Sequence, residues 1–279
     1  MNPDFDYRKI FNIQGRVIVI MGGAGKMGQA FAEFLSNAGG VIYITDINQS
    51  HVEEVAEKID KKSQGSVHGI KCDVSKESDI QNCFEQILFK EGKIHGLIYN
   101  VYAKPDGYYK AFSKYPKSTW DKVMDINISG AYLCCKEAVN AFTKLAVEGS
   151  IVLTLSTYGL VSPDFKIYEG LEASDNIYGN DDALTTPMPY TVSKSGLLGM
   201  IKWLAVSQGD KKIRVNGLSP GGVFDGQEKK FHEAYKERTP LGRMANWHDY
   251  NGAILFLMSD ASLYMTGSNL VVDGGWTAH

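Results

Sequence analysis

Short apolar runs rich in β-branched residues alternate along this chain with longer segments of helical spacing. The apolar runs occupy residues 16–21, 41–46, 67–74, 94–100, 149–156, 213–218 and 269–273. Helical spacing begins at Gln29 and recurs at roughly 49–62, 77–90, 119–147 and 190–208. Continuous apolar runs of this length are typical of strands buried on both faces of a parallel sheet. The alternation predicts one α/β domain, with a doubly wound, seven-stranded, mostly parallel sheet between two layers of helices.

The first apolar run is followed by a glycine-rich turn and then by a helix. Gly22, Gly25 and Gly28 have the spacing G-x-x-G-x-x-G. Glycines let the backbone approach a pyrophosphate, and the N-terminus of the helix offers free N–H groups to its charge. This layout predicts a Rossmann-type dinucleotide site, although a glycine-rich turn alone is more often a simple turn.

Asp46 ends the second predicted strand, where a ribose-binding carboxylate is expected. Such a carboxylate accepts hydrogen bonds from both adenosine ribose hydroxyls and repels a 2′-phosphate. The position therefore favours NAD over NADP. The alternative is that Asp46 caps the helix that starts near Gln49.

Residues 160–188 interrupt the alternation of strands and helices. This segment contains prolines, glycines and acidic residues, without a sustained helical or strand period. So long an irregular segment is unusual in a compact domain and often forms a lid or a binding loop. We expect a substrate-binding insert here.

The insert is followed by Tyr190 and Lys194, which lie four residues apart on a predicted helix. At that spacing the two side chains share one helix face. An ammonium group beside a phenol favours the ionised phenol, which can then exchange a proton near neutral pH. The pair alone is a weak signal, because this spacing arises by chance on many helix surfaces.

The composition favours no special partner or compartment. Lys and Arg number 29 against 32 Asp and Glu, a net charge of −3 in 279 residues, so nothing indicates nucleic acid or a membrane surface. The four cysteines show no metal-ligand spacing and are read as reduced core thiols. The sequence begins without the apolar stretch of a signal peptide, and no apolar run approaches the ~20 residues of a membrane span. A cytoplasmic protein without a metal site is expected.

Taken in order, several motifs resemble those of the short-chain dehydrogenase/reductase family, in its compact single-domain branch. They are Gly22 to Gly28, Asp46, Cys72-Asp73-Val74, Tyr99-Asn100-Val101, Asn127 within 125–130, Ser156 within 156–159, Tyr190-x-x-x-Lys194, residues 214–222 and residues 266–275. The resemblance spans nearly the whole chain. It implies hydride transfer between a nicotinamide cofactor, NAD or NADP, and a secondary alcohol or ketone.

The resemblance places the family's catalytic positions on four residues. Tyr190 is implied as the general acid in reduction and the base in oxidation, and Lys194 as the group that lowers its pKa and holds the nicotinamide ribose. Ser156 is implied to polarise the substrate oxygen, and Asn127 to hold a proton-relay water. The alternatives are that Ser156 only ends a strand and that Asn127 only kinks a helix.

The implied cofactor contacts are Gly22, Gly25, Lys26, Met27, Gly28, Asp46, Ile47, Asp73, Val74, Asn100, Val101, Tyr190, Lys194, Pro220, Gly222 and Val223. Four positions depart from the family pattern: Met21 replaces a threonine, Lys26 replaces a glycine, Tyr102 ends the motif that begins at Tyr99, and Asp225 stands where a threonine often contacts the nicotinamide. If Lys26 contacts a cofactor phosphate, the case against NADP becomes weaker. Asp73 is also explained as a turn residue, and 220–222 as an ordinary turn.

Residues 162–170 and 219–227 resemble a smaller group of bacterial oxidoreductases associated with flagellin modification and surface-polysaccharide synthesis. That implies a sugar or activated sugar as substrate. The candidate contacts are Tyr158, Tyr168, Glu169, Asp225 and Gln227, whose polar groups suit a hydroxylated ring. The alternative is that Tyr168 and Glu169 only fasten the loop.

Two other functions stay open at this point. One is a sugar epimerase or dehydratase that retains its NAD, as the glycine spacing suggests. The other is a catalytically silent nucleotide-binding protein, because Met21 and Lys26 are atypical. The family resemblance also implies a homotetramer or homodimer, paired through the helices near 119–147 and 190–208.

Overall fold

The computed structural model describes residues 9–178 and 182–278 and contains one sheet of seven parallel strands in the order β3-β2-β1-β4-β5-β6-β7. The strands are β1 (Val17–Met21), β2 (Val41–Asp46), β3 (Ser66–Lys71), β4 (Gly96–Tyr99), β5 (Gly149–Thr154), β6 (Ile213–Pro220) and β7 (Asn269–Val272). Each neighbouring pair is parallel. The predicted α/β class and strand number are confirmed.

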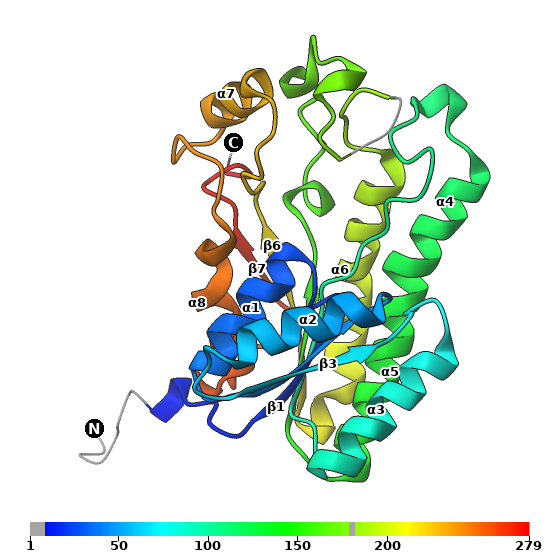
Figure 1. Cartoon of the computed structure of the whole chain (residues 1–279). Helices are drawn as coiled ribbons and strands as arrows, with labels where there is room; N and C mark the ends of the chain where they lie inside the picture. The colour runs from blue at the N-terminus through cyan, green and yellow to red at the C-terminus, as the bar shows by residue number, and fades with distance from the viewer. Residues whose placement is uncertain (1–8, 179–181, 279) are drawn as a thin grey trace.

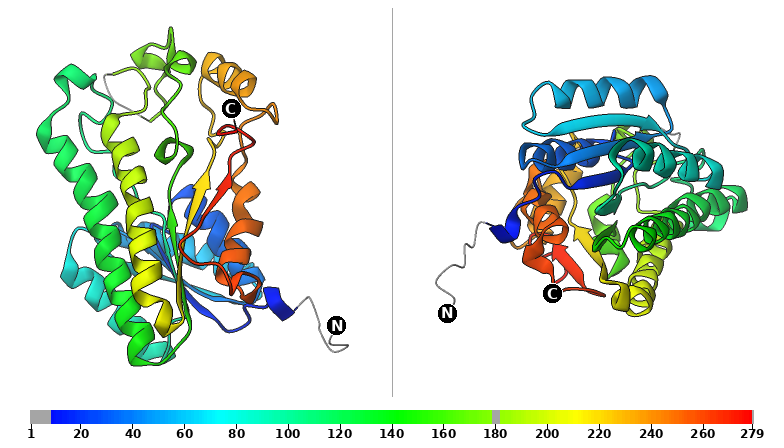
Figure 2. Two further views of the ribbon diagram at one scale, coloured as in Figure 1. Left: turned by 180° about the vertical axis from the view of Figure 1, so that it is seen from behind. Right: turned by 90° about the horizontal axis from the view of Figure 1, so that it is seen from below.

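Helices cover both faces of the sheet (Figures 1 and 2). They are α1 (Lys26–Asn37), α2 (Gln49–Asp60), α3 (Glu77–Glu91), α4 (Lys117–Met124), α5 (Gly130–Lys144), α6 (Met188–Gln208), α7 (Lys229–Arg238) and α8 (Asn251–Met258). Val19 of β1 packs in the core that α3, α5 and α6 share, and its neighbour Ile20 in the core of α1, α2 and α8. Because both faces are buried, the strands read as unbroken apolar runs.

The helix expected over 119–147 runs from Lys117 to Lys144 and changes its winding in the middle. A π-helical turn at Asp125–Ser129 separates α4 from α5, and Asn127 lies buried within it. π turns of this kind occur frequently at functional sites. The expected helix is therefore present, and its π turn agrees with the alternative that Asn127 kinks a helix.

The sequence analysis does not predict α7 and α8. α7 is largely charged and buries only Phe231 and Tyr235, so its apolar stripe is too narrow to stand out. α8 has only eight residues and is apolar around most of its circumference, which removes the helical periodicity. Both helices are fixed by tertiary packing.

The insert at 160–188 forms a third apolar cluster beyond the carboxyl ends of the strands. It contains short 3-10 turns at Phe165–Tyr168 and Ala173–Asp175. The ring of Tyr168 lies 5.4 Å from that of Phe231, which brings the insert beside α7 at the top of Figure 1. Gly179, Asn180 and Asp181 of the insert lie outside the described residues. The described part of the insert is held mainly by the packing of aromatic and aliphatic side chains, with little regular secondary structure.

The glycine turn brings β1 and α1 into close backbone contact. Gly22 has a φ of +72°, which favours glycine. A Cβ atom at Gly28 would lie 2.5 Å from the carbonyl oxygen of Gly22. A Cβ at Gly25 would meet that oxygen at 3.5 Å, an ordinary contact. The close approach therefore requires a glycine at position 28 but not at position 25.

All four cysteines are buried and free, as expected for reduced core thiols. Among the helices of residues 9–178 and 182–278, none is long and apolar enough to cross a membrane.

We predict that Gly28→Ala destabilises the protein while Gly25→Ala does not. The added methyl of Gly28→Ala meets rigid backbone, which costs about 1–3 kcal/mol in overpacked sites. Gly25→Ala should stay within about 0.5 kcal/mol, as for substitutions without a clash. Denaturant unfolding of the two variants measures the difference, and equal stabilities would contradict this account of the turn.

Candidate active site

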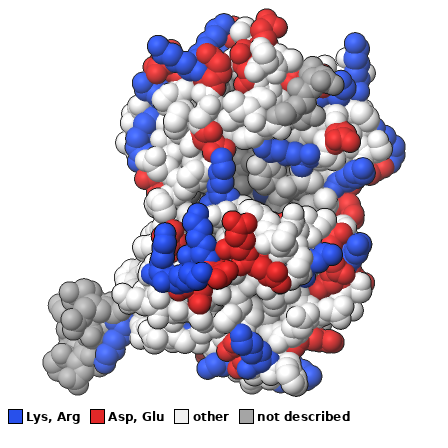
Figure 3. All heavy atoms as spheres, viewed as in Figure 1, with Lys and Arg blue, Asp and Glu red and all other residues white. Residues whose placement is uncertain are grey.

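A cavity of about 880 Å³ lies at the carboxyl ends of the strands. It extends from the glycine turn, past Asp46 and the ends of β4, β5 and β6, to the insert and α7. The strand order reverses between β1 and β4, and in open α/β sheets ligands bind at such a switch point. Figure 3 shows the hollow in the middle of one face, where acidic and basic side chains are interspersed.

Lys194 is the most deeply buried charged group of the cavity wall, with 3% of its surface exposed. Its Nζ donates a hydrogen bond to the carbonyl oxygen of Thr154, at 2.7 Å. Burial disfavours the ammonium form and lowers the pKa of Lys194 to about 7. The same nitrogen lies 5.9 Å from the centre of the Tyr190 ring. Lys194 therefore holds a proton that it can lose near neutral pH.

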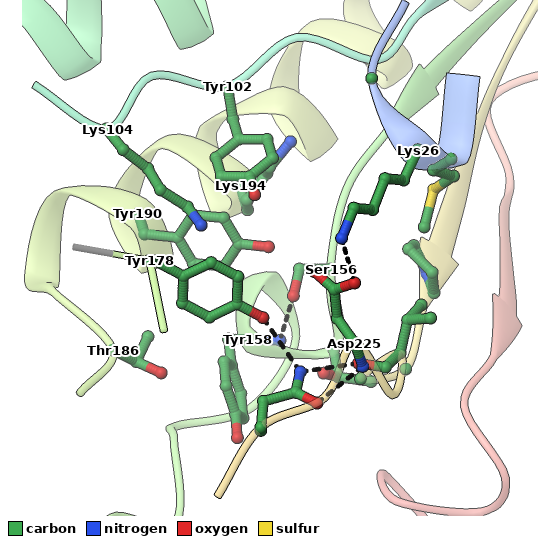
Figure 4. Close-up of a pocket in the computed structure, with 18 of the residues that line it drawn as sticks. Lys26, Tyr102, Lys104, Ser156, Tyr158, Tyr178, Thr186, Tyr190, Lys194 and Asp225 are labelled. Atoms are coloured by element: carbon green, nitrogen blue, oxygen red, sulfur yellow. Dashed lines mark hydrogen bonds and ion pairs between the residues drawn. The ribbon is translucent and has the colours of Figure 1, made fainter. Parts of the chain in front are cut away.

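Tyr190 and Ser156 meet at the wall of this cavity (Figure 4). A hydrogen bond with Ser156 lowers the pKa of Tyr190, but burial outweighs it and the pKa lies above its usual value. Burial and Ser156 account for the direction of this shift, and the expectation that Lys194 lowers the pKa of Tyr190 stays a prediction. Ser156 Oγ also accepts a hydrogen bond from the backbone N–H of Tyr158, at 3.2 Å. The serine hydroxyl is thus oriented beside the phenol.

Asn127 connects the segment after β4 to α6. Its Nδ2 donates to Ser193 Oγ and its Oδ1 accepts from the N–H of Ala103, both at 2.9 Å. The side chain is fully buried and does not line the cavity. Both the oxygen and the nitrogen of the Asn127 amide bind protein partners, so this side chain holds the two segments together. The proton-relay water stays a prediction.

Most of the expected cofactor residues line the cavity. They are Gly22, Gly25, Lys26, Met27, Asp46, Asn100, Val101, Tyr190, Lys194, Pro220, Gly222 and Val223. The exceptions are Gly28, Ile47, Asp73 and Val74. Gly28 packs beneath the turn, Ile47 is exposed beside Asp46, and Val74 is buried in the core.

Two acidic residues near the nucleotide end differ in their roles. Asp46 lines the cavity, and its carboxylate accepts a hydrogen bond from the N–H of Asn48 at 3.1 Å. The side chain that caps α2 is that of Asn48, so Asp46 does not fill the alternative role of helix cap. Asp73 accepts from the N–H and the hydroxyl of Ser75, which matches the turn-residue alternative.

The expected substrate residues divide into two groups. Tyr158, Tyr168, Asp225 and Gln227 line the cavity, whereas Glu169 is exposed and does not. Glu169 follows the 3-10 turn Phe165–Tyr168 and lies outside the aromatic cluster, so its contact with substrate stays a prediction that the cavity does not support.

Three of the lining residues are also held by protein partners. The hydroxyls of Tyr168 and Thr186 are hydrogen bonded at 2.6 Å, so Tyr168 fastens the insert as well as lining the site. Asp225 forms an ion pair with Lys26, and its N–H donates to Gln227 Oε1 at 2.7 Å. The Lys26–Asp225 pair joins the glycine turn to the segment after β6.

Many residues that line the cavity were not predicted from the sequence as site residues. These are Tyr102, Lys104, Tyr108, Tyr109, Ile177, Tyr178, Thr185, Thr186, Phe231, Tyr235, Met244 and Trp247. They come from irregular segments and from α7, where no period reveals which side chains turn inward. The departure at Tyr102 is the signal that could have pointed to the first two of them.

A glycine turn, an acidic residue ending β2, and a serine, tyrosine and lysine around one cavity define a nicotinamide-dependent oxidoreductase fold and site. The chain matches the family described as short chain dehydrogenase over residues 16–168, and the one described as enoyl-(acyl carrier protein) reductase over 176–277. It belongs to the short-chain dehydrogenase/reductase family, whose members are NAD(P)-dependent oxidoreductases.

Individual relatives cover nearly the whole chain. Post-translational flagellin modification protein A of Campylobacter coli is 26% identical, over 95% of this chain and 99% of its own. The NADP-dependent mannitol dehydrogenase of Hypocrea jecorina is 30% identical, over 96% and 94%. A short chain dehydrogenase of Leptospira borgpetersenii, solved with bound NAD⁺, superposes with a TM-score of 0.80 at 27% identity, over 95% and 94%. The similarity to the flagellin-modification group is confirmed.

We predict that Lys194 makes stability rise with pH above about 7. Its pKa of about 7 in the folded protein is below the ~10.4 of an unfolded lysine, so the unfolded chain binds more protons between these values. The free energy of unfolding should therefore increase, by at most about 1.4 kcal/mol per pH unit from this group. Denaturant unfolding between pH 6.5 and 9 should show a smaller slope for Lys194→Met. Lys114→Met, at an exposed lysine, should keep the native slope.

Proposed function

We propose that this protein transfers a hydride between NAD and a secondary hydroxyl or keto group of a sugar or activated sugar. The observation that carries the proposal is that Ser156, Tyr190 and Lys194 line the same continuous cavity as the glycine turn. A group that exchanges a proton with a substrate oxygen must lie beside the hydride carrier. One cavity here offers both.

The nucleotide end of the cavity fits a dinucleotide. α1 begins after Gly25, which has no side chain to occupy the first-turn N–H groups. A Cβ at Gly22 would lie 3.0 Å from the carbonyl oxygen of Asn100, so the backbone of the turn packs directly against the segment after β4. Backbone N–H groups left open at a helix N-terminus bind phosphate. A bound nicotinamide would supply the hydride acceptor or donor.

The chain's own residues would handle the proton and the charge. Tyr190 takes the proton from the substrate hydroxyl in oxidation and returns it in reduction. Ser156 donates a hydrogen bond to the same oxygen. Lys194 would hold the ribose hydroxyls and, when protonated, favour the phenolate. Thr154, which accepts from Lys194, fixes the ammonium at the end of β5.

The cavity's substrate end supports a hydroxylated substrate. Residues that carry hydroxyl groups line it, among them Tyr102, Tyr178, Thr185 and Thr186, and the tyrosine rings suit stacking on a sugar ring. Similarity to the flagellin-modification protein and to the mannitol dehydrogenase supports the same class. We extend this to a role in surface-glycan biosynthesis, which a gene deletion that leaves all surface glycans unchanged would contradict.

We also infer that the protein is a homo-oligomer, with a homotetramer as the expectation and a homodimer as the alternative. Large side chains lie exposed on two adjacent helices: Tyr132 on α5 is 56% exposed, and Trp203 and Val206 on α6 are 67% and 87% exposed. Large exposed apolar side chains that lie on neighbouring helices often mark a protein–protein interface. A monomer in light scattering would contradict the inference.

We predict that Tyr190→Phe abolishes turnover while cofactor binding survives. The substitution removes only the hydroxyl that exchanges the proton, and losing a general acid–base group costs about 10²–10⁴ in rate. Oxidation of a polyol panel should fall accordingly, while NADH should still raise the melting temperature. Turnover at the native rate would overturn the assignment; the loss of both turnover and NADH binding would show a damaged fold.

We predict a preference for NAD that depends on Asp46. Hydrogen bonds to a carboxylate contribute about 1.5–3 kcal/mol, roughly a factor of 10–100 in affinity. Calorimetric titration should therefore give tighter binding of NADH than of NADPH, and Asp46→Ser should remove most of the difference. Glu53→Gln, at an exposed acidic residue of α2, serves as the control. Tighter NADPH binding that Lys26→Met abolishes would instead assign the choice to Lys26.

A further inference from the structure

Lys104 lines the cavity together with Lys26 and Lys194, and it lies on the segment that follows β4. Its Nζ lies 3.6 Å from the centre of the Tyr178 ring and 5.3 Å from that of Tyr102. Figure 4 shows the Lys104 side chain reaching toward the rings of Tyr178 and Tyr190. Aromatic faces hold an ammonium group in place without using up its hydrogen-bond donors. The three N–H groups of Lys104 therefore stay available to a ligand.

The charge of Lys104 has no counter-ion among residues 9–178 and 182–278. No carboxylate of that set forms an ion pair with it. The nearby Asp225 is paired with Lys26, and Asp182 is paired with Lys110. Partial desolvation lowers the pKa of Lys104 to about 8, so the side chain is mostly protonated at pH 7. The substrate end of the cavity thus carries an unbalanced positive charge that solvent and ligands can reach.

Lys104 is also close to the reacting groups. The ring of Tyr102 lies within 6.0 Å of both Lys104 Nζ and Lys194 Nζ, and it meets the Tyr190 ring edge-on at 6.0 Å between centres. One aromatic ring therefore separates Lys104 from the tyrosine and lysine that would handle the proton. A ligand group bound by Lys104 would be a short carbon chain away from the reacting carbon.

We propose that Lys104 binds a carboxylate or phosphate carried by the substrate, so that the protein acts on an anionic sugar derivative rather than a neutral polyol. An ammonium group forms strong, charge-assisted hydrogen bonds with either anion. A neutral polyol would leave this charge unmatched, and specificity comes from matching such groups. The inference rests on the proposed dehydrogenase function and specifies its substrate class.

Three probes with the same carbon chain separate the possibilities: D-glucitol is neutral, D-gluconate carries a carboxylate, and D-glucitol 6-phosphate carries a phosphate. Calorimetry with the NADH-loaded protein should show one or both anions binding at least about tenfold more tightly than glucitol. Whichever anion is preferred identifies the source of the charge. Equal binding of all three probes would overturn the proposal.

Lys104→Met removes the charge while keeping the length of the side chain, and Lys104→Arg restores a cation. Lys104→Met should lose the tenfold preference, Lys104→Arg should recover most of it, and the surface variant Lys114→Met should keep it. A preference that survives in Lys104→Met would overturn the proposal. So would an equal loss of NADH affinity in this variant, because Lys104 would then serve the cofactor.

The binding measurement also separates this proposal from the proposed function. If the anions bind through Lys104 but no probe is oxidised with NAD⁺ or NADP⁺, the anion site stands and the dehydrogenase activity on these sugars fails. If glucitol is oxidised at least as efficiently as both anions, the dehydrogenase stands and the anion site fails. The ratio of kcat/KM for anion over glucitol, in the native protein and in Lys104→Met, decides the second case.

Discussion

The site depends on the burial of one ammonium group. Lys194 is enclosed at the end of β5, where its hydrogen bond to the Thr154 carbonyl compensates part of the desolvation cost. Close packing makes this possible: a Cβ on Gly159 would meet the carbonyl carbon of Lys194 at 2.9 Å, and Ser195 donates to the Gly159 carbonyl at 3.0 Å. The turn that carries Ser156 is thus seated directly on the helix that carries Tyr190. The relative position of the two hydroxyls follows from this contact.

The sheet and the placement of Tyr190 and Lys194 at one cavity could be predicted because their signals are local. The strands read as apolar runs, and Tyr190 and Lys194 have their spacing fixed by the helix. The interruption at Asp125–Ser129 could not be predicted, because it depends on Asn127 reaching Ala103 and Ser193, which only the tertiary fold brings near. The orientation of Glu169 could not be predicted for the same reason, because no period in an irregular segment shows which neighbour of Tyr168 turns toward the cavity.

The two ends of the cavity, one at the glycine turn and one at the insert, differ in how much of their wall is main chain. At the glycine turn the wall consists largely of main chain, so its shape is set by which residues lack a Cβ. At the insert and α7 the wall consists of aromatic and hydroxyl side chains. The first half is therefore readable from glycine spacing. The second half, to which Tyr102, Lys104 and Tyr178 belong, is not, because no sequence period shows which of its side chains turn into the cavity.

The third apolar cluster, formed by the insert, α7 and residues near the C-terminus, is separate from the two cores that sandwich the sheet. Its side chains belong to neither of these cores, so we expect substitutions among them to leave the packing of the strands largely unchanged. This separation makes the substrate end free to diverge while the hydride-transfer end is retained. Relatives with about a quarter to a third of their residues identical, and with names that refer to different substrates, are what such a division of the molecule would produce over evolution.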